Sequence, residues 1–155
     1  MGGCNSYSYL VVGVPINSIG VTLTKTLDTF EIHDERGRPT GKMKTETVCI
    51  IKTPTEEIRH DRFYIDTLET ACGLRDSQYN RLNELNLFAV MDYSDCIIGL
   101  EYKISTPDGN DFIQKINMGD LTDLRIKVNE ILKKHYGGYD FSELIQLYFV
   151  RNVSY

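Results

Sequence analysis

The sequence has no charged side chain before Lys25. Within this uncharged segment, the apolar run at residues 7–16 is too short to cross a bilayer, which takes about 20 apolar residues. The basic leading region of a secretory signal is also lacking. We therefore expect a cytoplasmic protein, and we expect no membrane partner.

Metal-finger spacing is lacking between any two of the four cysteines. Its absence excludes a zinc-binding fold of the common types. We expect a reducing compartment, in which three cysteines are buried thiols and one lies near the N-terminus. We also expect no metal ion and no other cofactor. The four residues are Cys4, Cys49, Cys72 and Cys96.

Tryptophan is absent, and so are low-complexity runs, internal repeats and linkers. Hydrophobic residues at 41% and charged residues at 25% exclude a disordered chain. A chain of 155 residues buries about 70% of its unfolded surface, so it needs no metal or disulfide to fold. We expect one α+β domain that spans residues 1–155.

Two interpretations of the uncharged N-terminus compete. Residues 7–16 are aromatic, β-branched and almost continuously apolar, as in a strand that is buried on both faces. Residues 1–6 also satisfy the pattern for N-myristoylation at Gly2, and Cys4 is placed for a second acyl chain. We favour the strand, because no basic cluster follows to hold an anionic membrane.

The middle of the chain predicts a long β-hairpin. Residues 29–33 and 43–52 carry strand patterns, and residues 34–41 between them are dense in turn formers. Residues 17–25 predict a loop before the first of these strands. Further strands are expected at residues 87–93 and 96–105.

Two helices are predicted. The first spans about residues 60–72, and the second begins at an Asp120 cap and ends before the glycines at 137 and 138. Residues 145–153 predict a closing strand, although residues 142–147 also resemble a capped helix start. The expected fold is therefore an antiparallel sheet of five to seven strands with two main helices packed on one face.

The tip of the predicted hairpin has the densest set of polar groups in the chain. A protruding hairpin can insert into a cleft of a partner, and arginine can bind a carboxylate through two hydrogen bonds. The alternative is a solvated turn whose charges keep it soluble. The predicted binding residues of the hairpin are Asp34, Glu35, Arg36, Arg38, Lys42 and Lys44.

Acidic residues concentrate in one later stretch. Residues 92–123 contain seven acids and two lysines, which accounts for the whole net charge of −5. Such a surface repels nucleic-acid phosphates and favours a protein partner with a basic groove. We therefore predict that Asp92 and Asp95 bind a partner, and we expect no nucleic-acid partner. The alternative is plain solvation of a hairpin and a helix start.

No catalytic residue is predicted with a clear signature. His33 and His60 are each followed by aspartate, a pair that hydrolases use around a divalent ion. Residues 37–42 resemble a phosphate-binding loop but lack its spacing and its following helix.

The sequence as a whole favours a small non-enzymatic accessory protein that binds another protein, such as a viral or phage-type inhibitor of a host protein. The alternatives are a small hydrolase or nucleotide-handling enzyme that uses His33 and His60, and a self-associating structural protein, such as a homodimer.

Overall fold

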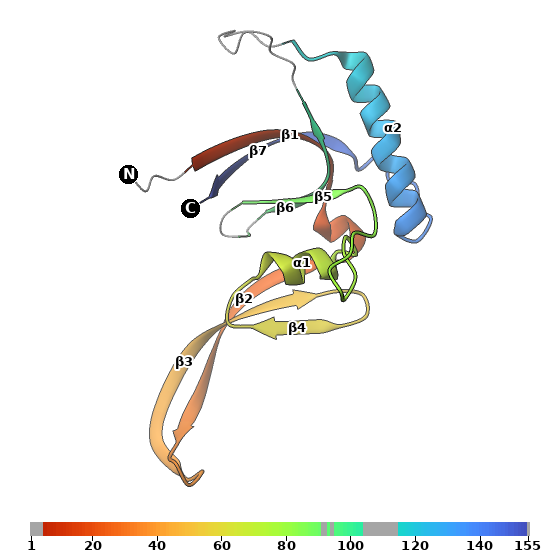
Figure 1. The fold of residues 1–155 in the computed structure, drawn as a ribbon. Coiled ribbons are helices and arrows are strands. Elements are labelled where there is room, and N and C mark those ends of the chain that lie inside the picture. The colour runs from red at the N-terminus through yellow and green to blue at the C-terminus, as the bar shows by residue number, and fades with distance from the viewer. Residues whose placement is uncertain (1–4, 91–92, 94, 104–114, 155) are drawn as a thin grey trace.

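The computed structural model describes residues 5–90, 93, 95–103 and 115–154 (Figure 1). The fold is mixed α+β, with two antiparallel sheets and two α-helices. The four-stranded sheet has the order β5-β6-β1-β7, and the three-stranded sheet has the order β2-β3-β4. Seven strands agree with the predicted number, but the expectation of one sheet was wrong.

The N-terminal strand lies in the middle of the four-stranded sheet. Strand β1 (Asn5–Pro15) pairs with β6 (Cys96–Tyr102) on one side and with β7 (Gln146–Ser154) on the other. Its neighbouring residues Val11 and Val12 point to opposite faces, and both are buried. The prediction of a strand buried on both faces is confirmed, and β7 settles the choice of a closing strand over a helix.

The four-stranded sheet is curled so that its two edge strands meet. Gly13 lies opposite Gly99, and a Cβ at Gly13 would overlap the carbonyl oxygen of Ile98. Because both residues are glycines, the backbones of β1 and β6 approach closely and the sheet bends. The edge strand β5 (Asn86–Ala89) thereby contacts β7, and the concave face holds a small apolar cluster around Val11 and Val150.

The main core lies on the other face of this sheet. Helix α2 (Met118–His135) packs against β1 and β6 and buries Val128 and Leu132. Leu121, Leu124 and Ile131 of the same helix also pack against the core. The predicted cap is wrong by three residues, because the Asn117 side chain accepts a hydrogen bond from the Asp120 backbone N–H.

The second sheet begins where the chain leaves β1. A short 3₁₀ helix (Ile16–Ile19) ends at Gly20, whose φ of 84° turns the chain into β2 (Thr22–His33). Residues 22–25, which we expected in a loop, therefore belong to a strand. Strand β3 (Pro39–Lys52) returns antiparallel to β2, and the short β4 (Glu57–His60) pairs with the inner end of β3.

Helix α1 (Ile65–Ala71) is shorter than predicted, because His60 ends β4 instead of opening the helix. Its Leu68 is fully buried in the main core. We use the term body for the four-stranded sheet, both helices and the inner end of the second sheet. The rest of the β2–β3 hairpin extends away from the body (Figure 1). Among the described residues, no helix is long and apolar enough to cross a membrane.

Candidate functional site

The projecting part of the hairpin, residues 24–47, is the candidate site and is called the arm below. Every residue of the arm is exposed except Glu31, which is half-buried. Below the arm, Leu23 and Ile51 join the main core and fix the hairpin to the body, and Cys49 is also buried. The arm contains all six of the binding residues that the sequence predicted in the hairpin.

Asp34 organises the tip of the arm. Its Oδ1 accepts hydrogen bonds from the backbone N–H groups of Arg36 and Arg38, both at 2.9 Å. Its Oδ2 accepts a hydrogen bond from Arg38 Nε at 3.1 Å. These donors, the Arg38 backbone N–H above all, lower the pKa of Asp34. Asp34 and Arg38 therefore hold the turn together, whereas Glu35 and Arg36 are exposed at its end.

A β-bulge separates the tip from the regular part of the arm. The pairing of β2 with β3 shifts between Glu31 and His33. Gly41 has a φ of 77° here, and its N–H donates to Glu31 Oε1 at 3.0 Å. The Thr40 hydroxyl donates to the Ile32 carbonyl at 2.6 Å. Regular pairing therefore stops near residue 42, and the chain changes direction there.

One face of the arm is mostly uncharged. Leu27 lies opposite Thr47, and Thr29 lies opposite Thr45, so these side chains share a face. The Thr29 and Thr45 hydroxyls hydrogen-bond at 3.1 Å. Leu27 is 71% exposed, and Met43, on the same face, is 61% exposed. Sequence reasoning missed this face, although the alternation of residues 43, 45 and 47 in β3 carried the signal.

The opposite face of the arm is charged. Asp28 lies directly opposite Glu46, an arrangement in which like charges repel. Lys44 Nζ lies 2.9 Å from Glu46 Oε1 and offsets part of this repulsion. Phe30, opposite Lys44, is the exposed aromatic residue of this face. The two faces thus offer different chemistry to a partner.

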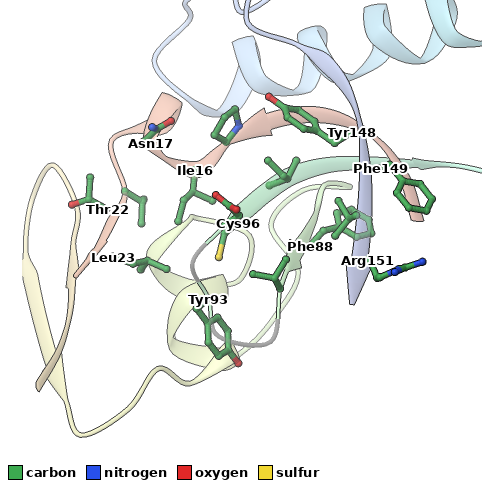
Figure 2. A pocket seen from close by; sticks show the side chains of 16 residues that line it. Ile16, Asn17, Thr22, Leu23, Phe88, Tyr93, Cys96, Tyr148, Phe149 and Arg151 are labelled. Atoms are coloured by element: carbon green, nitrogen blue, oxygen red, sulfur yellow. The ribbon is translucent and has the colours of Figure 1, made fainter. Parts of the chain in front are cut away.

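Of the two acidic binding residues that were predicted, Asp95 is described and Asp92 lies outside the described residues. Asp95 is exposed and borders a cavity of about 540 Å³ at one end of the curled sheet. Ile16 and Leu23 lie on one side of this cavity, and Phe88 and Tyr148 lie on the other (Figure 2). Asp95 is therefore placed at a mostly apolar hollow of the body, apart from the arm.

The two histidines are far apart. His33 lies opposite Pro39 at the outer end of β3, and His60 lies opposite Cys49 near its inner end. Ten residues of strand separate these positions, which corresponds to roughly 30 Å. No ion or proton relay bridges such a gap. Within the described part of the chain, no group of three His, Cys, Asp or Glu side chains is placed to hold a metal ion.

Cys49, Cys72 and Cys96 are buried thiols, as predicted, and Cys4 lies outside the described residues. Burial raises the pKa of the Cys72 thiol to about 12. At neutral pH this thiol is protonated, and only the thiolate is a good nucleophile. Cys72 therefore belongs to the core, where its thiol stays protonated.

Comparison with models of protein families, with curated proteins and with solved structures found no match for this chain.

Proposed function

We propose that the protein is a non-enzymatic accessory protein that acts by binding another protein through its arm. The observation that carries this proposal is the exposure of the arm on both faces, with large apolar side chains among the exposed ones. A two-stranded hairpin that leaves the body in this way adds little to the core. Burying Leu27 and Met43 in a partner would contribute about 1.5–3 kcal/mol each.

The polar residues of the arm add specificity to this apolar contact. Glu35 and Arg36 at the tip, together with Lys42 beside it, are exposed and carry both signs of charge. Charges at the rim of an interface select the partner and its orientation more than they add affinity. Inhibition of a host protein, with the arm occupying its cleft, is the form of this function that we propose.

The body supports this function in three ways that we also propose. Helices α1 and α2 cover the same face of the four-stranded sheet and leave the arm uncovered, since both contribute to one core cluster. Asp95 provides a second, acidic contact for a partner with a basic groove. The protein works in the reducing cytoplasm, which suits its buried thiols.

An enzymatic function is not proposed. The hydrolase or nucleotide-handling alternative needs the two histidines in one site, and the pairing of β3 holds His33 and His60 at its opposite ends.

The test is a quantitative pull-down from extracts of the native host with matched variants of the arm and the body. The arm variant is Leu27→Asp with Met43→Asp. The control is Ile126→Asp, which changes an exposed apolar residue of α2. The arm variant is expected to lower recovery of the partner at least about tenfold, and the control is expected to leave it unchanged. Equal recovery of the partner with the parent protein, the arm variant and the control would refute the arm as the binding site.

A further inference from the structure

The outer edge of β3 is unpaired along most of the arm. Strand β4 pairs with β3 from Cys49 inward, and no described strand pairs with this edge between Gly41 and Cys49. An exposed edge of this kind presents backbone N–H and C=O groups to another strand. Because a two-stranded ribbon is only marginally stable, a further strand here would stabilise the arm.

We propose that this further strand is the β3 of a second copy of the chain. Residues 42–48 of two copies pair antiparallel about a two-fold axis at Thr45, and the two arms become one four-stranded ribbon. This inference goes beyond the proposed function and does not depend on it, because the purified protein alone tests it.

The ends of the unpaired edge match each other in this arrangement. The partner's Lys42 falls opposite Val48, so the ladder uses the whole unpaired stretch. The partner's Gly41 then falls opposite Cys49, the first residue that β4 covers. Gly41 has a positive φ at the bulge, so the partner's chain leaves the regular strand where β4 begins.

Charge complementarity selects the register. With Thr45 on the axis, the partner's Glu46 lies opposite Lys44 and the partner's Lys44 lies opposite Glu46. Each repelling pair of Asp28 and Glu46 thereby gains a second cation next to it. Opposite charges across neighbouring strands stabilise a sheet by about 0.2–1 kcal/mol per pair.

Neighbouring registers are all worse. An axis at Lys44 gives as many opposite-charge pairs, because Lys42 then lies opposite the partner's Glu46, but it also places Lys44 opposite its own copy. An axis at Glu46 places Glu46 opposite its own copy, so like charges repel in both registers. An axis at Met43 places Lys42 opposite the partner's Lys44. An axis at Thr47 requires pairing at Cys49, where β4 already lies.

The dimer would also widen the uncharged face of the arm. Thr29 and Thr45 already hydrogen-bond across the hairpin, and the two-fold axis extends them into a row of four threonines. Leu27 and Met43 of both copies border this row. The interface consists of about six to eight backbone hydrogen bonds and few buried side chains, so association is weak and depends on concentration.

The first test uses charge reversal in purified protein. In Lys44→Glu and in Glu46→Lys, each homodimer places like charges opposite each other twice, whereas a mixture of the two variants restores opposite charges. Sedimentation equilibrium should show self-association weakened about tenfold or more in each variant alone and restored in the mixture. Both variants lose the ion pair within the chain, so that loss cannot account for the restoration.

The second test locates the axis by oxidative cross-linking. Opposite residues on neighbouring strands have Cα atoms about 4.5–5.5 Å apart, which suits a disulfide. Thr45→Cys should form a covalent dimer. Thr29→Cys lies on the same face but one strand further from the axis, and it should not. A monomer at concentrations up to about 1 mM, equal cross-linking of both variants, or a mixture that does not associate would each overturn the inference.

Discussion

The body and the arm are built from the same kind of structure, antiparallel β-strands, but their side chains meet opposite environments. In the body, β1 is buried on both faces, and neighbouring valines of one strand serve two different apolar clusters. In the arm, both faces of β2 and β3 are exposed. The comparison indicates that the body folds through its own contacts. The arm is maintained by local hydrogen bonds, and its side chains are available for contacts with other molecules.

The largest expected effect is at the glycine pair of the body. In Gly13→Ala, the new Cβ overlaps the Ile98 carbonyl oxygen, so β1 and β6 have to separate. We expect a loss of at least about 3 kcal/mol in the free energy of unfolding, measured by urea denaturation.

The matched control is Gly41→Ala in the arm, where a Cβ meets nothing within 4 Å and only the positive φ is unfavourable. It should cost about 1 kcal/mol, mostly as local opening of the arm. If Gly13→Ala and Gly41→Ala gave similar unfolding curves, the two glycines would be equally important for stability, and the proposed difference between body and arm would be wrong.

The next largest difference between body and arm is expected when one leucine of each is truncated to alanine. Leu132 of α2 is fully buried, and Leu27 of the arm is 71% exposed. Leu132→Ala should lower the free energy of unfolding by about 2–5 kcal/mol, because it leaves a cavity in the core. Leu27→Ala should change it by less than about 0.5 kcal/mol. A clear loss of stability in dilute Leu27→Ala would mean that the arm packs on the body.

Alkaline pH should weaken the body through Tyr136. This hydroxyl donates to the Cys72 carbonyl at 2.7 Å, and burial raises the pKa of Tyr136 to about 12. A tyrosine whose pKa is raised in the folded state stabilises the fold at pH values below the ordinary tyrosine pKa of about 10. This stabilisation is lost as the pH rises toward about 12.

The check is the free energy of unfolding of Tyr136→Phe against pH. We expect the variant to be less stable by about 1–3 kcal/mol at neutral pH, because the buried Cys72 carbonyl loses its donor. Between about pH 10 and pH 12 the variant should lose less further stability than the parent protein. If the free energies of unfolding of the variant and the parent protein fell in parallel between about pH 10 and pH 12, the loss of stability could not be assigned to Tyr136.

The smallest expected effect is at the tip of the arm. The pKa of Asp34 is lowered, so its stabilisation of the turn is present above the ordinary aspartate pKa of about 4 and is lost as the pH falls further. Asp34→Asn should speed amide exchange at Arg36 and Arg38, as measured by NMR, and should leave unfolding of the body unchanged. If Asp34→Asn also changed the free energy of unfolding of the body, the tip of the arm would be coupled to the body, which would contradict this account of an exposed arm.

The sequence predicted the parts of this fold that local pattern controls. Residues 7–16 are mostly apolar at both odd and even positions and rich in β-branched and aromatic residues, as in a strand that is covered on both faces. The turn formers at residues 34–41 likewise placed the tip of the arm. The same reasoning predicted Asp34 and Arg38 as binding residues, but it could not foresee that they hydrogen-bond to each other.

Features that depend on the path of the chain in space were not predictable. The second sheet exists because Gly20 turns the chain out of the first one, and a single glycine gives no sign of that direction. The bend of the four-stranded sheet depends on Gly13 and Gly99, which are 86 positions apart in the sequence but lie opposite each other. The uncharged face of the arm appears only once the register of β2 and β3 is known.

Hydrogen exchange of the whole protein at low and high concentration tests the central claim most directly. The account predicts that the amides of β1 and β6 exchange slowly at both concentrations, whereas arm amides exchange quickly in dilute protein and become protected at residues 42–48 when it is concentrated. Protection of the arm equal to that of β1 in dilute protein, independent of concentration, would contradict it.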